Sequence, residues 1–422
     1  MVEQPIEVDV QIGGQDLPAG RLWTHHHGQR ESATFSYRED YLQRADGYEL
    51  DPGLPLQSGQ HQTALGQALF GAMSDCAPDG WGRRLVRRVE AQRAREAATQ
   101  QRALAELDFL LGARDDLRQG ALRFRARGGE QYLAVDAEGV PGLIMLPRLL
   151  NAAEELERDE PTSEDLRLLL HGGSSLGGAR PKAHMLDTHG RLGIAKFPSP
   201  NIDEWDVIRW EAVALELAEA GGINVPEHEL HVVEDRPVLV VRRFDRDPSG
   251  RVGYLSAMSM LQARDGEQAS YLEIAEAIEE RSPAVNADLR ELWRRIIFTI
   301  LISNTDDHLR NHGFLRKSTA GWSLSPAFDL NPNPEGAAKQ LATAIDESNA
   351  EASIATALNV AGLFRLSEAE ARQIVDELST ATARWQEVAR AMGLATPELQ
   401  RLAPAFEHEQ LVAARKLVGT QS

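Results

Sequence analysis

The sequence predicts an α+β fold with a small N-terminal subdomain, a strand-rich first lobe and a mainly helical second lobe. Apolar and polar residues alternate in residues 6–10 and 33–37, a period typical of strands. Strand patterns return after a glycine-rich stretch and continue to Phe244, whereas apolar residues beyond Tyr271 recur at helical spacing. We therefore expect three parts, which are residues 1–115, 116–245 and 246–422.

Length and composition indicate a globular protein of two or three domains. The chain has 422 residues, of which 42% are hydrophobic and 26% are charged, and a domain takes about 150 residues. Cys76 is the single cysteine, so no internal disulfide can form and we expect a buried or partly buried thiol. The first residues lack a signal-peptide pattern, and no apolar run approaches about 18 residues. We expect a soluble, cytoplasmic protein without membrane contact.

The net charge argues against direct binding of nucleic acid. The chain carries 45 basic and 64 acidic side chains, a formal charge of −19. Proteins that bind nucleic acid on their own neutralise phosphates with lysine and arginine. Any contact with DNA would therefore need a basic partner.

The stretch from Ser303 to Leu330 turns abruptly from an apolar helix pattern to polar residues. Asp306 and Asn311 stand five positions apart, and Asp329 follows after two short strand patterns. Protein kinases order their phosphoryl-transfer residues in this way: an aspartate that accepts the substrate proton, an asparagine for metal, a hairpin and a second aspartate for metal. The spacing alone leaves open a polar turn in which these side chains only bond to nearby backbone.

A second stretch, His171 to Lys182, contains four glycines and two serines. Backbone that is rich in glycine can approach phosphates closely and point N–H groups at them. The pattern is not a Walker A loop, and a flexible linker remains the alternative. Two strand patterns follow this stretch, and Lys196 lies at the end of the second. Protein kinases place at this position the lysine that holds the α and β phosphates.

The sequence also predicts helices in other parts of the chain. Residues 79–115 have a helical pattern, whose arginines at 83, 84, 87 and 88 form either a solvated face among acidic neighbours or a docking face. Glu211, in a helix expected over 203–221, either pairs with Lys196 or is exposed. Two more helices are expected between Ser367 and Val418.

These motifs together resemble those of the HipA-type bacterial serine/threonine kinases, the toxin halves of toxin–antitoxin pairs. The resemblance covers nearly the whole chain. It is carried by GRLW at 20–23, FSY at 35–37, SSLGGARPK at 174–182, GIAKF at 193–197, INVPEHEL at 223–230, RRFDR at 242–246, SNTDDHLRNHGF at 303–314 and LSPAFDL at 324–330.

The resemblance implies a two-lobed protein-kinase-like fold that uses ATP and Mg²⁺. Asp306 would be the catalytic base, Asn311 and Asp329 the Mg²⁺ ligands and Lys196 the phosphate-binding lysine. Arg242 and Phe244 would offer backbone hydrogen bonds to adenine. The residues expected to lie against ATP are Gly177, Gly178, Ala179, Arg180, Pro181, Lys182, Lys196, Arg242, Arg243, Phe244, His308, Arg310, Asn311 and Asp329.

The same resemblance leads to expectations for two further positions. Ser175, with Ser174 as the alternative, matches the serine that becomes autophosphorylated in the family and switches the kinase off. A dianion in a loop that holds phosphates would repel ATP. Asp307 stands where the family commonly has glycine, so we expect an extra carboxylate near the metal, which either alters metal affinity or faces solvent.

The resemblance also implies partners. A small, basic helix-turn-helix antitoxin of the HipB type would bind the acidic chain and carry it to operator DNA. The protein substrate would be a component of translation, with an aminoacyl-tRNA synthetase as the family precedent. Two other functions stay open, which are a small-molecule phosphotransferase of kinase-like fold and a catalytically weak scaffold that acts as a corepressor with its antitoxin.

Overall fold

The structure is a computed structural model of the whole chain. It describes residues 5–28, 30–78, 80–134, 139–173, 178–336, 339–347 and 349–419. The chain forms two compact units, of which unit 1 comprises Met1–Ile202 and Val232–Leu255 and unit 2 comprises Asp203–His231 and Ser256–Ser422. The three predicted part boundaries remain predictions. No helix in the described ranges is both long and apolar enough to span a membrane.

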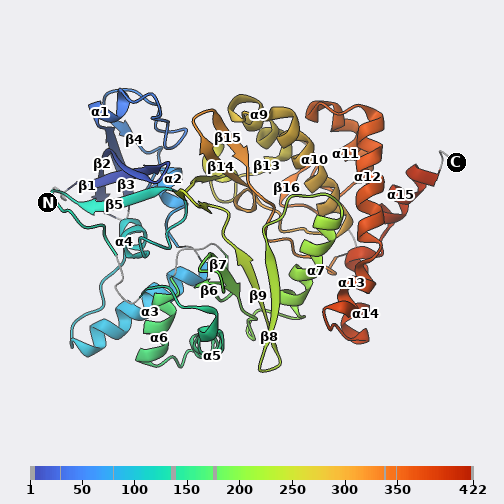
Figure 1. The fold of residues 1–422 in the computed structure, drawn as a ribbon, viewed down its shortest axis with the longest axis horizontal. Coiled ribbons are helices and arrows are strands. Elements are labelled where there is room, and N and C mark those ends of the chain that lie inside the picture. The colour runs from blue at the N-terminus through green and yellow to red at the C-terminus, as the bar shows by residue number, and fades with distance from the viewer. Residues whose placement is uncertain are drawn as a thin grey trace. The chain divides into compact units, whose positions relative to one another are not determined.

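Unit 1 begins with a five-stranded antiparallel sheet (Figure 1). Its order is β4-β3-β2-β1-β5, with the strands β1 (Ile6–Ile12), β2 (Gln15–His27), β3 (Arg30–Tyr37), β4 (His61–Gln62) and β5 (Leu122–Ala126). Alternate residues of the strands enter the core, where Val8, Leu22 and Phe35 are fully buried. The predicted strands over 6–10 and 33–37 are therefore confirmed.

Short and long helices complete the first part of unit 1. They are α1 (Glu39–Leu42), α2 (Gly71–Ser74), α3 (Gly80–Glu96), α4 (Glu106–Gly112), the 3₁₀ turn η1 (Leu143–Met145), α5 (Leu146–Glu157) and α6 (Ser163–His171). The single helical pattern expected over 79–115 is wrong as a continuous helix. Ala98 has a φ of 50°, in the left-handed region, and the amide of Thr99 donates to the carbonyl of Ala94, so α3 closes before α4 begins.

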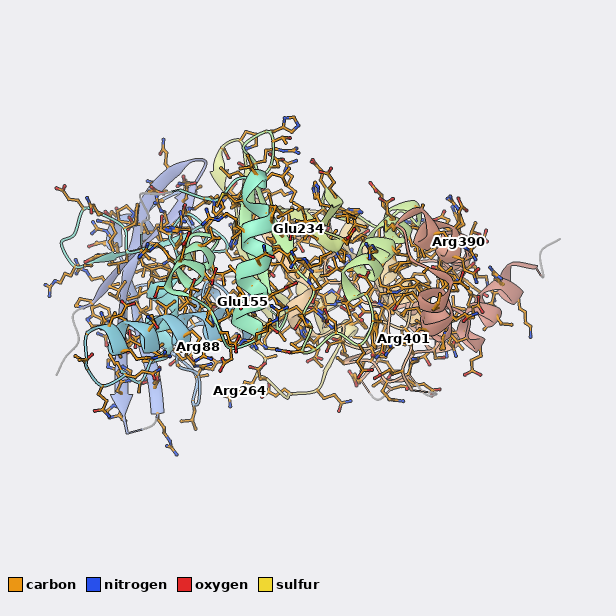
Figure 2. The ribbon with its side chains drawn as sticks, turned by 90° about the horizontal axis from the view of Figure 1, so that it is seen from below. Arg88, Glu155, Glu234, Arg264, Arg390 and Arg401 are labelled. Atoms are coloured by element: carbon orange, nitrogen blue, oxygen red, sulfur yellow. The ribbon has the colours of Figure 1, made fainter. Side chains whose placement is uncertain are left out.

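Three of the four arginines expected to form a face on α3 are paired inside unit 1. Arg83 forms a bidentate ion pair with Glu106, at 2.6 Å for each bond. Arg84 pairs with the buried Glu157 at the end of α5, and Arg88, which Figure 2 labels, pairs with Asp159. The expectation of a face surrounded by acidic neighbours is therefore met for these three side chains.

A second sheet follows the glycine-rich stretch. Its strands in unit 1 are β6 (Lys182–Leu186), β7 (Leu192–Lys196) and β9 (Arg236–Arg242), in this order, and β8 (His228–Val233) belongs to unit 2 up to His231. Side chains of α3, α5 and α6 pack with this sheet into one apolar cluster, which includes Leu85, Leu149, Leu169, Met185 and Val238. Three short strands follow, which are β10 (Arg246–Asp247), β11 (Gly250–Arg251) and β12 (Gly253–Ser256).

Unit 2 is mainly helical, as expected (Figure 1). Its helices are α7 (Val207–Ala220), α8 (Ala257–Met260), α9 (Tyr271–Arg281), α10 (Val285–Leu301), η2 (Leu309–Asn311), α11 (Ile354–Val360), η3 (Ala361–Phe364), α12 (Glu368–Thr382), α13 (Trp385–Ala391), α14 (Thr396–Phe406) and α15 (Glu409–Gly419). Its strands are β13 (Ala269–Ser270), β14 (Gly313–Ser318), β15 (Gly321–Leu324) and β16 (Thr343–Ala344). The α+β fold class is confirmed.

The prediction of two helices between residues 367 and 418 is wrong, because the structure has four. Gly393, with a φ of 83°, ends α13, and Pro397 lies in the first turn of α14, where proline is tolerated. Glu211 on α7 is buried, so the exposed alternative for this side chain is wrong. Cys76 is also buried, as expected, and burial raises its pKa to about 12.

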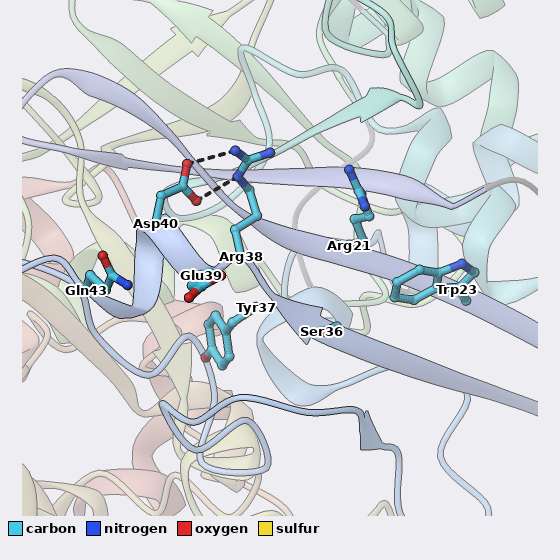
Figure 3. Close-up of a pocket in the computed structure, with 8 residues that line it drawn as sticks. All are labelled: Arg21, Trp23, Ser36, Tyr37, Arg38, Glu39, Asp40 and Gln43. Atoms are coloured by element: carbon cyan, nitrogen blue, oxygen red, sulfur yellow. Dashed lines mark hydrogen bonds and ion pairs between the residues drawn. The ribbon is translucent and has the colours of Figure 1, made fainter.

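A cavity of about 580 Å³ lies over β2, β3 and α1 in unit 1 (Figure 3). It is lined by Arg21, Trp23, Ser36, Tyr37, Arg38, Glu39, Asp40 and Gln43. Its two arginines are already paired, Arg21 with Glu7 and Arg38 with Asp40. The residues predicted to contact ATP are not among those that line it.

Candidate active site

The predicted site residues fall into two sets, one in each unit. The glycine-rich stretch, both lysines and the segment 242–244 belong to unit 1, whereas Asp306, Asn311 and Asp329 belong to unit 2.

Ser174, Ser175 and Gly177 lie outside the described residues. The residues that follow, Gly178–Pro181, form the C-terminal stem of the glycine-rich stretch. Gly178 has a φ of 101°, and a Cβ at this position would lie 2.8 Å from Nζ of Lys182. Ala179 and Arg180 continue the bend, and the carbonyl of Pro181 accepts a hydrogen bond from the amide of Phe197 at 2.9 Å. Glycine at 178 therefore permits both the turn and the close approach of the lysine ammonium.

Lys182 and Lys196 face each other across β6 and β7. The two residues are paired in the antiparallel register, so their side chains point to the same side of the sheet, with Cβ atoms about 5 Å apart. Both are half-buried. Two ammonium groups on one side of a sheet can bind a phosphate group between them.

The C-terminal stem is also held by the first turn of α3. The amide of Trp81 donates to the carbonyl of Gly178 at 3.1 Å. A Cβ on Gly80 would lie 2.5 Å from the same carbonyl oxygen, closer than any real contact. Glycine at 80 is therefore what allows α3 to approach the glycine-rich stretch.

The segment that follows β9 combines sheet pairing with buried charge. Arg242 lies opposite Gly193 of β7, and the amide of Arg243 donates to the carbonyl of Leu192 at 3.0 Å. The side chain of Arg243 is buried and binds Asp245 through Nε at 2.8 Å and Nη2 at 2.5 Å. Phe244 is half-buried with its ring 6.4 Å from that of Tyr254.

Asp245 shows how firmly this segment is fixed. Burial alone would raise the pKa of its carboxyl, but Arg243 and Arg246 outweigh that effect and hold it below its ordinary value. Its Oδ2 also accepts from the amide of Gly120 at 2.8 Å. A carboxylate with these partners fixes the backbone on both sides of Phe244.

In unit 2, the structure brings Asp306 and Asn311 together. Both lie in the loop between α10 and β14, where the exposed Asp306 precedes η2 and the buried Asn311 ends it. Nδ2 of Asn311 donates to the carbonyl of Asp306 at 3.1 Å. The side-chain nitrogen Nδ2 of Asn311 therefore holds the loop. Its side-chain oxygen Oδ1 is the atom that can act as a metal ligand.

Asp307 is turned away from this pair. It is buried, and its Oδ2 accepts from Tyr271 Oη at 2.5 Å and lies 3.1 Å from His312 Nε2 and 3.4 Å from Thr299 Oγ1. Burial raises its pKa, but His312 and the hydrogen bonds outweigh this and keep the pKa below its ordinary value. Asp307 is buried and anchors the loop to the core, so the expectation that it faces solvent is wrong, and its effect on metal affinity stays a prediction.

Asp329 lies near the same end of a hairpin as Asn311. Strands β14 and β15 pair from Phe314 and Leu324, and the amide of Ser325 donates to the carbonyl of Gly313 at 2.7 Å. Asn311 precedes this bonded pair by two residues, and Asp329 follows it by four. Asp329 has a φ of 60°, a strained conformation of the kind that clusters at functional sites.

The other two residues predicted for this half differ in exposure. Arg310 is exposed and paired with Asp265, whereas the ring of His308 is half-buried and its Nδ1 has no hydrogen-bond partner in the described part of the chain. The backbone of His308 holds the loop, because its amide donates to Asp306 and its carbonyl accepts from Asn311.

Asn304 was not singled out by its sequence. It is 1% exposed, and neither its Nδ2 nor its Oδ1 has a hydrogen-bond partner among the residues that the structure describes. It stands two positions before Asp306 and directly after Ser303, whose φ is 53°. A buried amide without partners is costly, and only its nearness to Asp306 could have drawn attention to it.

The side chains present suit ATP and Mg²⁺. Unit 1 offers two facing ammonium groups beside a glycine-rich backbone, which suits a polyphosphate. Unit 2 offers one carboxylate, Asp329, and one amide oxygen, of Asn311, and Mg²⁺ prefers oxygen ligands and usually takes only one or two from protein beside the phosphates.

Two family models match the chain, one in its N-terminal part and one in its C-terminal part. Residues 10–112 match the model described as the HipA N-terminal domain, and residues 174–385 match that described as the HipA-like C-terminal domain. The second match covers half of the chain.

Individual relatives are more distant. A putative kinase of Haemophilus influenzae is 28% identical over 190 residues, which are 39% of this chain and 54% of that protein. The putative kinase Y4dM of Sinorhizobium fredii is 28% identical over 152 residues, which are 32% of this chain and 36% of the relative. The chain thus aligns with about half or less of the length of these curated relatives.

One solved structure matches almost the entire chain. It is the complex described as the Shewanella oneidensis MR-1 toxin–antitoxin system HipA, HipB and its operator DNA. The TM-score is 0.65 at 18% identity, and the match covers 98% of this chain and 97% of that one. At this identity the likeness concerns the fold.

Proposed function

Because the chain belongs to the HipA family, we propose that it is an ATP- and Mg²⁺-dependent serine/threonine protein kinase and the toxin half of a toxin–antitoxin pair. The observation that carries the proposal is the pairing of Asp306 with Asn311, in which one amide holds the loop and leaves its oxygen for metal. The order of the residues along the chain supports the same activity.

In this proposal unit 1 binds the nucleotide. Lys182 and Lys196 hold the phosphates, and the backbone from Gly177 to Lys182 lies over them. The backbone of Arg242 and Phe244 binds adenine. Arg243 supports this segment from within, since its guanidinium is bound to Asp245.

Unit 2 performs the transfer. Asp306 accepts the proton of the substrate hydroxyl as the oxygen attacks the γ-phosphorus and the bond to the β-phosphate oxygen breaks. Asn311 and Asp329 would hold Mg²⁺, which when bound neutralises charge on the phosphates. Asp307, Tyr271 and His312 keep the loop in place and touch no reacting atom.

The finer parts of the proposal concern targets. The acidic chain, with its charge of −19, suits a basic helix-turn-helix antitoxin, through which it would reach operator DNA. The protein substrate is a component of translation, for which an aminoacyl-tRNA synthetase is the family precedent. Ser175, or Ser174, is the site of autophosphorylation in the glycine-rich stretch, and the protein acts in the cytoplasm.

The test is intact-mass spectrometry after incubation with Mg²⁺ and ATP, followed by peptide mapping. We expect the wild type and Asp376→Asn, a change on α12 away from the loop, to gain phosphate on Ser175 or Ser174. Asp306→Asn should gain none. A phosphate gain in Asp306→Asn equal to that of the wild type would show that Asp306 is not the catalytic base.

The same experiment separates the alternatives. Labelled phosphate that appears on an added small molecule and not on protein would favour a small-molecule phosphotransferase. No gain of mass and no release of ADP by a wild type that was unphosphorylated at the start would favour a corepressor scaffold.

A further inference from the structure

The N-terminal stem of the glycine-rich stretch is bonded twice to one histidine. This stem is Gly172–Gly173, which follows α6. The carbonyl of Gly172 accepts from the amide of His184 at 2.6 Å, and Nδ1 of the same residue lies 2.9 Å from that oxygen. His184 is on β6 and is 1% exposed, so water does not compete for these bonds.

The other ring nitrogen of His184 contacts the segment after β9. Its Nε2 lies 2.8 Å from Nη1 of Arg243. A guanidinium can only donate, so Nε2 accepts, and the proton of the neutral ring is on Nδ1, which donates to Gly172. Burial, followed by the charge of Arg243, lowers the pKa of His184 well below its ordinary value, and the ring keeps this tautomer.

Arg243 is itself immobilised, so it can fix the ring. Nη1 also donates to the carbonyl of Leu117 at 2.6 Å, and Nε and Nη2 bind Asp245. A single imidazole therefore links the stem of the glycine-rich stretch to the residues proposed to bind adenine. All of these atoms belong to unit 1.

The stem has no room to shift on the ring. Gly173 has a φ of 74°, and a Cβ there would lie 2.9 Å from Nδ1 of His184 and 2.5 Å from Cδ1 of Leu117. The backbone of the stem is thus packed directly on the imidazole. Movement of the stem would break the bond from Nδ1 to Gly172.

We propose that His184 is a positioning residue that sets the glycine-rich stretch for ATP binding through its Nδ1–H bond to Gly172. It touches no nucleotide and acts through the stem. The proposal rests on the proposed function, because it assumes that this stretch binds phosphates. A role as core filler is the alternative, and the two roles predict opposite orders for two variants.

The variants are His184→Asn and His184→Gln. The shorter amide of asparagine can place its NH₂ where Nδ1 lies and keep the bond to Gly172. Glutamine reaches the position of Nε2, keeps an acceptor for Arg243 and loses the donor to Gly172. If the hydrogen bond to Gly172 sets the stem, His184→Gln should weaken ATP binding more than His184→Asn. If His184 only fills the core, the smaller side chain of His184→Asn should be the more damaging.

The experiment is titration of each protein with Mg²⁺ and mant-ATP, a fluorescent ATP analogue. We expect the dissociation constant of His184→Gln to rise about fivefold, the effect of one lost hydrogen bond, and that of His184→Asn to rise less than twofold. With ATP as substrate, the KM of His184→Gln should rise at unchanged kcat. Equal dissociation constants for the three proteins, or a larger rise for His184→Asn, would overturn the inference.

Amide hydrogen exchange without nucleotide gives a second readout. The peptide that covers residues 166–182 should exchange faster in His184→Gln than in the wild type and His184→Asn, and equal exchange in all three would count against the proposal. A wild type that does not bind mant-ATP would overturn the proposed function, whereas wild-type binding with unchanged variants would overturn this inference alone.

Discussion

The hydroxyl of Tyr271 lies 2.5 Å from Oδ2 of Asp307, and both groups are buried in unit 2. Asp307 directly follows Asp306, the proposed catalytic base, so this contact holds the backbone of the loop next to that residue. The carbonyl of Asp307 is held as well, because Thr343 Oγ1 donates to it at 2.6 Å.

Removal of the Tyr271 hydroxyl should destabilise unit 2. Tyr271→Phe leaves a buried carboxylate with one donor fewer, and we expect the free energy of unfolding to fall by about 1.5–3 kcal/mol at pH 7. Urea unfolding measures this. The control is Tyr132→Phe, whose hydroxyl binds Asp9 at 2.9 Å at a half-buried position and should cost less. Equal unfolding of Tyr271→Phe and the wild type would contradict the role given to this contact.

The same pair gives the protein a defined response to acid. The pKa of Asp307 is below its ordinary value, so its contribution is complete above the unfolded pKa of about 3.9 and is lost as pH falls through the lower, folded pKa. Without the Tyr271 hydroxyl the folded pKa of Asp307 lies closer to the unfolded one, so Tyr271→Phe should lose less stability than the wild type as pH falls, and the difference in stability between the two proteins should narrow. Unfolding between pH 5 and pH 3 compares them, and parallel curves would be the wrong result for this account.

The facing lysines should contribute to the stabilisation of the protein by nucleotide. Lys182→Gln removes one of the two side chains proposed to hold the phosphates, so we expect its melting temperature with Mg²⁺ and ATP to exceed that without them by less than in the wild type. A tenfold weaker affinity removes about 1.4 kcal/mol of stabilisation by ligand. Thermal unfolding measures both values. The exposed Lys317, changed to Gln, is the control, and an undiminished rise in Lys182→Gln would contradict the phosphate-binding role.

Contact between α3 and the glycine-rich stretch should be visible in ATP affinity. Gly80→Ala places a Cβ 2.5 Å from the carbonyl oxygen of Gly178, which forces the C-terminal stem to move, and we expect mant-ATP binding to weaken about tenfold. The control is Gly112→Ala at the end of α4, where a Cβ meets nothing within 4 Å. If both variants bind like the wild type, α3 does not position the stem.

Replacement of Asn304 should separate stability from activity. Both of its amide atoms are buried without hydrogen-bond partners in the described ranges, so Asn304→Ala sacrifices no hydrogen bond there, and we expect it to cost less than about 1 kcal/mol. Turnover of ATP should nevertheless fall, because the residue lies at the base of the loop that holds Asp306. Asn333→Ala, which loses a 2.7 Å bond to Thr305, serves as the contrast with a clear loss of stability. Unchanged turnover in Asn304→Ala would exclude a functional role.

Local patterns in the sequence were enough for the strands and for the order of the site residues. The alternation in residues 6–10, the glycines before Lys182 and the spacing of Asp306 and Asn311 each depend on a few neighbouring positions. The break at Ala98 and the division of the last helices depend on single backbone angles that a periodic pattern does not register.

Long-range contacts account for the rest. Asp307 looked like a metal or solvent-facing carboxylate because its partner Tyr271 is 36 positions away in the chain. His184 was one polar residue in a strand pattern, and its contacts to Gly172 and Arg243 join three separate segments. Burial of this kind follows from tertiary packing, which spacing along the chain does not encode.

The burial of Asp307 also bears on how the metal ion is acquired. Asp307 is buried in contacts with Tyr271 and His312, and the proposed metal ligands are one carboxylate, of Asp329, and one amide oxygen, of Asn311. Mg²⁺ gives up its water reluctantly and is commonly held by a few protein oxygens together with phosphates. The protein should therefore have little affinity for free Mg²⁺, and the ion should arrive already bound to ATP, so that the supply of nucleotide controls metal loading.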